Sequence, residues 1–181
     1  MENHKQWKNI IDSSWTLFLD RDGVINRRLP DDYVKRVEEF EFLPMVLEAM
    51  SIFSRCFAHI VVVTNQQGIG KGLMGEEDLD AIHKHMLCEI NLHGGRLDGI
   101  FHCPQLRDSV DNYRKPNPTM AYMAQQQFPD INMRKSIMIG DSDSDIVFGR
   151  NVGMSTIFIG SSNNDADDVF CSLYEFAKTL I

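Results

Sequence analysis

The chain alternates between short apolar runs and longer helical patterns, and this alternation constrains its fold more than any other feature. Its short runs are rich in β-branched or aromatic residues and lie at 17–19, 60–63, 99–102, 137–139 and 156–159. Near-continuous apolarity is typical of parallel strands that are covered on both faces. Helical patterns lie between these runs, at residues 44–56, 76–92, 118–128 and 143–151. This order predicts an α/β fold with a doubly wound, Rossmann-like parallel sheet.

The length of the chain indicates one domain. Its 181 residues are enough for a sizeable single core, and no linker or internal repeat divides them. We expect one domain over residues 1–181, with its core at about 15–160. A C-terminal helix is expected at about 166–180, where Leu173, Phe176 and Leu180 make an apolar stripe.

Charge and composition exclude several classes of partner. The formal net charge is −8 and no basic run offsets it, which argues against a nucleic-acid partner. Residues 1–14 contain no long apolar stretch, and no later apolar run is long enough to span a bilayer, so we expect no signal peptide and no membrane partner. Its 4 cysteines are widely spaced, as in a reducing compartment rather than a disulfide framework. These features predict a cytoplasmic protein, and we also expect it to act as a monomer.

Two carboxylates follow the first strand-like run. Asp20 and Asp22 are one residue apart, and Gly23 follows them. Side chains alternate along a strand, so both acids reach one place only if the backbone leaves strand geometry, which Gly23 permits. Such a pair can hold a divalent cation, attack an electrophile or transfer a proton. An ordinary polar turn is the alternative explanation of this segment.

Three other segments carry polar side chains near the expected carboxyl edge of the sheet. Thr64 and Asn65 end one run and precede a glycine-rich stretch that could cradle phosphate. Lys115 precedes a helical pattern, and Asp141 and Asp145 follow another strand-like run. Each segment is a weak signal by itself. Their occurrence together, each near a strand end, predicts a single site at the edge where open α/β sheets bind ligands.

This order of acid pair, threonine, lysine and acid pair resembles that of phosphatases of the haloacid dehalogenase (HAD) superfamily. Further segments resemble one subfamily, which holds the D-glycero-D-manno-heptose 1,7-bisphosphate phosphatases and the histidinol-phosphate phosphatases. The matching segments are 20–26, 33–34, 39–42, 64–69 and 114–118. The resemblance implies a HAD-like core with a minimal cap, because no large insertion fits between the motifs.

The resemblance also implies the catalytic roles. Asp20 would attack phosphorus and form an aspartyl-phosphate. Asp22 would protonate the leaving alcohol and then activate water. Mg²⁺ would be held by Asp20, by Asp141 and by the backbone carbonyl of Asp22.

Phosphate-binding roles are implied for the remaining motif residues. Thr64, Asn65 and Lys115 would contact the phosphoryl oxygens. Arg114 would bind a second phosphate or a sugar hydroxyl, because its planar fork suits anions. Asp145 would support the site by orienting Lys115 or the metal shell.

The chain departs from the subfamily in one loop. The subfamily carries a structural zinc loop whose ligands are a cysteine, a histidine two residues later, and a Cys-x-Cys directly before Arg-Lys. Here Cys103 remains, but Gln105, Asp111 and Tyr113 occupy the other positions. One thiolate cannot make the four-ligand site that structural zinc requires, so zinc is not expected.

The combined hypothesis is a magnesium-dependent phosphomonoester hydrolase of carbohydrate metabolism that acts on a small phosphorylated metabolite. The resemblance favours a D-glycero-D-manno-heptose 1,7-bisphosphate 7-phosphatase-like activity. Histidinol-phosphate phosphatase is the alternative, and a non-catalytic phospho-acceptor module is a more distant one.

Overall fold

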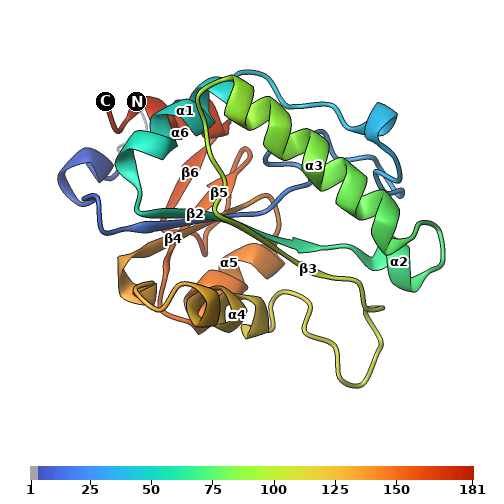
Figure 1. The fold of residues 1–181 in the computed structure, drawn as a ribbon. Helices are drawn as coiled ribbons and strands as arrows, with labels where there is room; N and C mark the ends of the chain where they lie inside the picture. Colours follow the sequence, from blue (N-terminus) through green and yellow to red (C-terminus); the bar gives the residue numbers. More distant parts are fainter. Residues whose placement is uncertain (1–3) are drawn as a thin grey trace.

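The computed structural model describes residues 4–181 as a parallel β-sheet between two layers of helices (Figure 1). Its strands are β1 (Thr16–Leu19), β2 (His59–Asn65), β3 (Gly99–Cys103), β4 (Ser136–Gly140), β5 (Ser155–Ile159) and β6 (Asp168–Phe170). Neighbouring strands all pair in parallel, in the order β3-β2-β1-β4-β5-β6. The predicted doubly wound α/β fold is confirmed.

Helices cover both faces of this sheet. They are α1 (Val46–Cys56), α2 (Gln67–Gly70), α3 (Glu76–Leu92), α4 (Thr119–Gln127), α5 (Asp143–Asn151) and α6 (Leu173–Lys178), with short 3-10 helices η1 (Trp7–Asn9), η2 (Val37–Glu39) and η3 (Met133–Lys135). In Figure 1, α1, α3 and α6 lie above the sheet, and α4 and α5 lie below it.

Each face of the sheet has its own apolar core. Leu17 and Leu19 of β1 pack into the core that α1, α3 and α6 cover, whereas Phe18 packs into the core beside α4 and α5. All three side chains are fully buried. Because side chains alternate along a strand, a strand between two cores must be apolar at every position. This explains the unbroken apolar run in the sequence.

The C-terminal segment differs from the prediction. The expected helix at about 166–180 begins only at Leu173, and β6 precedes it. Val169 and Phe170 pair with β5 as an edge strand, since β-branched and aromatic side chains suit a half-buried sheet surface. The side chain of Ser172 then accepts a hydrogen bond from the backbone N–H of Glu175 and caps α6.

The strand order places a crevice at the carboxyl ends of β1 and β4. From β1 the chain proceeds outward through β2 and β3 on one side, and β4, β5 and β6 lie on the other. Doubly wound sheets bind ligands outside the point where the order reverses. Asp20 directly follows β1 and Asp141 directly follows β4, so both lie at this point.

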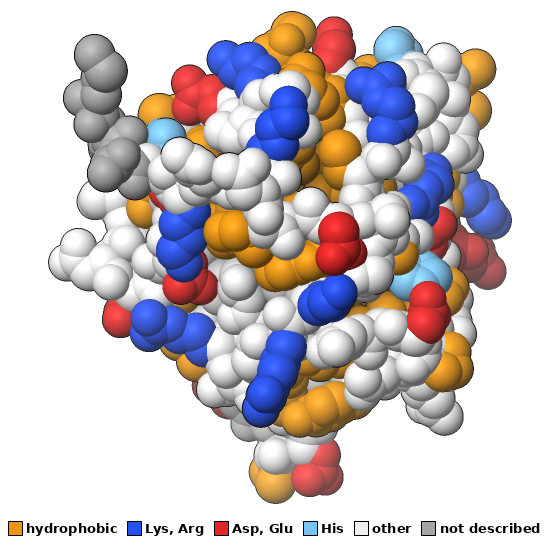
Figure 2. Space-filling model, turned by 90° about the vertical axis from the view of Figure 1, so that its left-hand side faces the viewer, with side chains coloured by type: hydrophobic (Ala, Val, Ile, Leu, Met, Phe, Trp, Pro, Cys, Tyr) orange, Lys and Arg blue, Asp and Glu red, His pale blue; other side chains and the backbone are white. Residues whose placement is uncertain are grey.

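Charged side chains of both signs are mixed on the side of the molecule where the strands begin (Figure 2). Figure 2 views the molecule from the left of Figure 1, where the strands begin, and Lys and Arg side chains are scattered among acidic and apolar ones. Among residues 4–181, no helix combines the length and apolarity needed to cross a membrane.

Candidate active site

The site begins where β1 ends. The backbone N–H of Asp20 still donates to the Ile139 carbonyl at 2.9 Å, as in the sheet, and its side chain is almost buried. The chain then turns at Gly23, whose φ is +91°. A Cβ atom at this position would overlap the carboxylate of Asp141. Gly23 therefore allows the turn and also leaves room for an acid from another strand.

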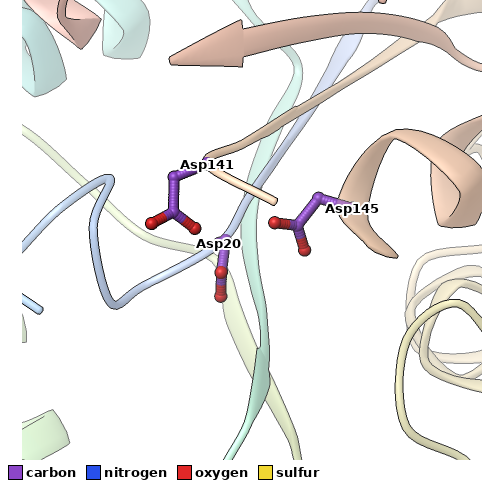
Figure 3. A group of neighbouring side chains, drawn as sticks. All are labelled: Asp20, Asp141 and Asp145. Atoms are coloured by element: carbon purple, nitrogen blue, oxygen red, sulfur yellow. The ribbon is translucent and has the colours of Figure 1, made fainter. Parts of the chain in front are cut away.

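Three carboxylates meet at this point. Asp20 comes from the end of β1, Asp141 from the end of β4 and Asp145 from the first turn of α5 (Figure 3). One oxygen of each lies within 4.8 Å of the others. Oδ1 of Asp141 is buried and has no hydrogen-bond partner in the described part of the chain. A cluster of carboxylate oxygens with one buried oxygen unused fits a hard divalent cation such as Mg²⁺.

Burial and mutual repulsion raise the pKa values of Asp20 and Asp141 in this cluster. Burial raises the pKa of Asp20 to about 7; Lys115 opposes this rise, and the nearby carboxylates of Asp145 and Asp141 add to it. Burial also raises the pKa of Asp141, and Asp145 contributes to that rise. Buried like charges disfavour ionisation, and a bound cation would restore it.

Lys115 connects two of these acids. Its Nζ lies 2.9 Å from Oδ1 of Asp20 and 2.7 Å from Oδ1 of Asp145, and it donates to the carbonyl of Val63 at 2.7 Å. Burial acts to lower the pKa of Lys115, but the carboxylates of Asp145 and Asp20 outweigh burial and raise it. The ammonium is thus charged and fixed by three oxygen atoms.

Asn65 holds the backbone of this lysine. Its Oδ1 accepts a hydrogen bond from the N–H of Lys115 at 3.0 Å, and its Nδ2 donates to the Lys115 carbonyl at 3.4 Å. Asn65 also lines the pocket. The observed contacts therefore give its amide a positioning role, and the phosphate contact expected from the sequence stays a prediction.

Asp145 contacts Lys115 through one carboxylate oxygen and Ser142 through the other. Its Oδ2 accepts hydrogen bonds from the backbone N–H of Ser142 at 3.1 Å and from the Ser142 hydroxyl at 2.6 Å. It is fully buried, and a Cβ atom at Gly140 would overlap it. The same carboxylate therefore caps α5 and orients Lys115.

Asp22 lies on the pocket wall outside the three-carboxylate cluster. Nη2 of Arg21 lies 3.0 Å from both of its oxygens, and the amides of Asn26 and Gln66 donate to it at 2.9 and 2.8 Å. Burial acts to raise the pKa of Asp22, but Arg21 and the hydrogen bonds outweigh burial and lower it. The structure thus fixes the carboxylate and favours its ionised form.

Gln66 links Asp22 to Thr64, a connection that sequence reasoning missed. Its Nε2 donates to Oδ2 of Asp22 at 2.8 Å and to Oγ1 of Thr64 at 2.9 Å. Both Gln66 and Thr64 are buried. The only signal in the sequence was the position of Gln66 directly after the Thr64-Asn65 motif.

Arg21 and His83 form a buried layer behind Asp22 that sequence reasoning also missed. Arg21 is fully buried, and its Nη1 lies 3.3 Å from Nε2 of His83. Burial lowers the pKa of His83 to about 3, and the Arg21 guanidinium contributes. A neutral imidazole therefore accepts the hydrogen bond from Arg21, which leaves Nη2 directed at Asp22. No motif marked this histidine, because its role depends on packing.

A pocket of about 440 Å³ opens above these groups. Asp20, Asp22, Thr64, Lys115 and Asp141 all line it, so the structure brings the predicted site residues together. The more exposed part of its wall, called the mouth, carries four basic side chains and two acidic ones: Arg28, Lys71, Arg107, Arg114, Asp31 and Asp32.

Two of these basic residues differ in their partners. Nη1 of Arg28 lies 3.3 Å from Oδ2 of Asp141. Arg114 is half-buried, and its Nη1 has no hydrogen-bond partner among residues 4–181. An unpaired buried guanidinium nitrogen suits an anionic ligand.

The loop after β3 does not carry a zinc-type ligand set. The Cys103 thiol is buried and donates to Oε1 of Gln105 at 3.7 Å, and the same oxygen accepts a hydrogen bond from the backbone N–H of Tyr113 at 2.9 Å. Asp111, at another position where the subfamily carries a cysteine, is exposed. One thiol, an amide, a carboxylate and a phenol do not match the nitrogen and sulfur ligands of structural zinc.

Comparison with known proteins identifies close relatives. A HAD-hydrolase-like family model matches residues 112–178. A D-glycero-α-D-manno-heptose-1,7-bisphosphate 7-phosphatase of Mycobacterium bovis is 41% identical over 173 residues, which cover 92% of this chain and 91% of the relative. A D-glycero-β-D-manno-heptose-1,7-bisphosphate 7-phosphatase of Rhodopseudomonas palustris is 35% identical over 144 residues, covering 76% and 78%.

A solved structure is similar over nearly the whole fold. The D,D-heptose 1,7-bisphosphate phosphatase of B. bronchiseptica, crystallised with magnesium and phosphate, superimposes with a TM-score of 0.82 at 28% identity. The match covers 92% of this chain and 97% of that structure.

Proposed function

This chain belongs to the D-glycero-D-manno-heptose 1,7-bisphosphate 7-phosphatase family of HAD-like hydrolases, and we propose that it removes the C7 phosphate of heptose 1,7-bisphosphate in a magnesium-dependent reaction. As a member of this phosphatase family it is a phosphatase. The observation that carries the proposal is the convergence of Asp20, Asp141 and Asp145 with Lys115 in one pocket.

Asp20 is the proposed nucleophile. Its carboxylate lies at the floor of the pocket, next to the Lys115 ammonium. In the proposed first step a carboxylate oxygen of Asp20 bonds to phosphorus, the bond from phosphorus to the C7 oxygen breaks, and an aspartyl-phosphate forms. Lys115 and the Thr64 hydroxyl would stabilise the negative phosphoryl oxygens during this transfer.

Asp22 is the proposed acid and base. In the first step it would give a proton to the departing C7 oxygen, and in the second it would take a proton from the water that attacks the aspartyl-phosphate. Its lowered pKa favours the carboxylate form, which the second step uses, and acts against the protonated form that the first step uses. Arg21, Asn26 and Gln66 would keep this carboxylate oriented through both steps.

Asp20, Asp141 and the backbone carbonyl of Asp22 are the proposed magnesium ligands. The buried, unpartnered Oδ1 of Asp141 supports this assignment. When bound, Mg²⁺ would offset the repulsion between an anionic nucleophile and a phosphate dianion. Asp145 would act indirectly, because it fixes Lys115 and caps α5.

A bisphosphate fits the charge distribution of the pocket. The proposed catalytic acids and Arg114 line the same pocket, and one guanidinium nitrogen of Arg114 is buried without a hydrogen-bond partner in the described part of the chain. We propose that Arg114 binds the second phosphate of the substrate while the first lies over Asp20. The relatives named above act on either the α or the β anomer.

A phosphate-release assay tests the proposal. The substrates are the α and β anomers of heptose 1,7-bisphosphate, histidinol phosphate and p-nitrophenyl phosphate, each with Mg²⁺ or with EDTA. We expect the highest kcat/KM for one heptose anomer, heptose 1-phosphate as product, and reversible loss of activity in EDTA.

Two results would contradict the proposal. A higher kcat/KM for histidinol phosphate would assign the alternative substrate. Stoichiometric labelling of the protein without turnover would indicate a phospho-acceptor instead.

The remaining expectations concern the state of the protein. We propose that it works as a single domain over residues 1–181, as a monomer in the cytoplasm. Size-exclusion chromatography with light scattering tests the monomer, and a dimer mass would contradict it.

A further inference from the structure

Residues 103–114, the mouth loop, run from the end of β3 to Arg114 and contribute Arg107 and Arg114 to the pocket wall. Within this loop Gln105 joins two distant points. Its Oε1 accepts a hydrogen bond from the Tyr113 backbone N–H at 2.9 Å and lies 3.7 Å from the Cys103 sulfur, the donor of a second hydrogen bond. One amide therefore holds the start and the end of the loop together.

Gln67 attaches the middle of the mouth loop to α2. Its Oε1 accepts a hydrogen bond from the backbone N–H of Arg107 at 2.6 Å, and its Nε2 donates to the Tyr33 hydroxyl at 3.1 Å. Beside it, the N–H of Gly70 donates to the carbonyl of Pro104 at 3.0 Å. A Cβ atom at Gly70 would lie 2.6 Å from that carbonyl oxygen, so only glycine permits this contact.

Asn112 fixes the outer turn of the loop. Its Nδ2 donates to the carbonyls of Arg107 and Ser109, both at 2.9 Å, and its Oδ1 accepts a hydrogen bond from the Arg114 N–H at 3.3 Å. Its amide thereby joins the backbones of Arg107 and Arg114. The positions of the two arginines are coupled through one side chain.

The mouth loop leaves an uncompensated positive charge at the pocket. Lys71, Arg107 and Arg114 line the cavity, and within residues 4–181 no carboxylate forms an ion pair with any of them. Burial lowers the pKa of Arg114, and the neighbouring Arg107 guanidinium lowers it further. The acids on the same wall are Asp31 and Asp32, and Asp32 is paired with Lys35 at 2.6 Å. Adjacent unpaired guanidinium groups are a suitable site for a dianion.

We infer that the mouth loop is a metal-independent specificity element, in which the side-chain amides of Gln67, Gln105 and Asn112 replace a metal centre and place Arg107 beside Arg114 to bind the second anionic group of the substrate. This inference rests on the proposed function for the identity of that group. The amide contacts themselves do not depend on the substrate.

Metal analysis tests the first part without any substrate. We expect the purified protein to contain no stoichiometric zinc, and a zinc-selective chelator in the presence of Mg²⁺ to leave the Tm unchanged. One zinc per chain, together with a lower Tm after chelation, would overturn the inference.

Two variants test the second part through the ratio of kcat/KM for heptose 1,7-bisphosphate to kcat/KM for p-nitrophenyl phosphate, which has no second anion. Arg107→Gln should lower this ratio about tenfold, mainly through KM, because a charged hydrogen bond to the second phosphate is lost. Gln67→Met should lower it about threefold by releasing the Arg107 backbone. Gln67→Glu, which keeps the oxygen acceptor, should recover most of that loss.

Arg134→Gln is the matched control, because Arg134 is an exposed arginine on η3 outside the pocket. It should leave the ratio unchanged. A ratio for Arg107→Gln within twofold of the unmodified enzyme would overturn the role of Arg107. If the unmodified enzyme hydrolyses p-nitrophenyl phosphate but not heptose bisphosphate, the proposed substrate fails, whereas the metal analysis still decides how the loop is held.

Discussion

The floor and the mouth of the pocket are built in different ways. The floor acids and Lys115 lie at the ends of β1 and β4, in the first turn of α5 and on the segment before α4, and they are largely buried. The basic residues of the mouth lie on loops, with Lys71 directly after α2, and Arg107 is exposed. The sheet therefore fixes the groups proposed for the chemistry, whereas the side chains proposed to select the substrate lie on loops.

The two regions also differ in whether their charged side chains form ion pairs. At the floor, Lys115 lies within 3 Å of two carboxylates and a carbonyl. At the mouth, Arg107 and Arg114 lie near each other without an acidic partner in the described chain. A balanced buried cluster is costly to disturb, whereas an unbalanced exposed one is available for a ligand.

The largest expected effect comes from the floor. Asp20→Asn should lower kcat by about 10⁴-fold or more, because the amide cannot act as the nucleophile. Circular dichroism should show the fold intact, and phosphate release measures the activity. Asp143→Asn, at the exposed start of α5, is the matched control and should retain full activity. Near-normal turnover by Asp20→Asn would show that Asp20 is not the nucleophile and that the chemistry does not depend on the floor.

Lys115→Met should give the largest loss of stability. It leaves the buried carboxylates of Asp20 and Asp145 without their cation, which costs about 3–5 kcal/mol in the free energy of unfolding. Urea unfolding measures this loss. Lys135→Met, whose side chain is 47% exposed, should cost less than about 0.5 kcal/mol. Equal unfolding midpoints for the two variants would show that the floor is not a tightly coupled cluster.

The pH dependence of the free energy of unfolding tests whether His83 is buried and neutral behind Asp22. Its pKa is about 3 in the folded protein against 6.5 ordinarily, so its contribution to stability is present above pH 6.5 and is lost as pH falls towards 3. Between pH 7 and pH 5 this loss amounts to roughly 2 kcal/mol. His83→Gln should unfold with a pH dependence that is flatter by that amount in urea titrations at both pH values. An unchanged slope would place the imidazole in a more solvated setting.

The smallest expected effect concerns the mouth. Arg114→Lys keeps the charge but loses the planar fork, so KM for heptose 1,7-bisphosphate should rise about fivefold to tenfold while kcat changes little. Steady-state kinetics measure both values, with Arg134→Lys as the surface control. A fall in kcat of the size expected for Asp20→Asn would mean that Arg114 belongs to the floor instead.

Much of the fold could be predicted from the sequence, because strands buried on two faces and amphipathic helices leave clear periodic patterns. All five predicted strands and the four internal helices form within about two residues of their expected bounds. The edge strand β6 was missed, since three residues are too few to show a period. It also shortened the predicted C-terminal helix.

The candidate site was predictable in part. Asp20, Asp141 and Lys115 could be identified because each stands at or near a strand end within a recognisable motif. Gln66 could not, because its contact with Asp22 joins residues 44 positions apart. The two hydrogen bonds between the Asn65 amide and the Lys115 backbone could not be predicted either, because they form only when the loop after β3 folds back beside β2.

The sequence by itself determined the α/β architecture and the edge of the sheet at which the polar residues gather, because apolar periodicity and strand-end motifs are local properties. Only the tertiary structure decided how those residues are held: Lys115 between two acids, Arg21 against His83, and Arg107 on an amide-bonded loop. The physical reason is that burial, charge pairing and side-chain hydrogen bonds depend on contacts between distant segments, and these contacts exist only after folding.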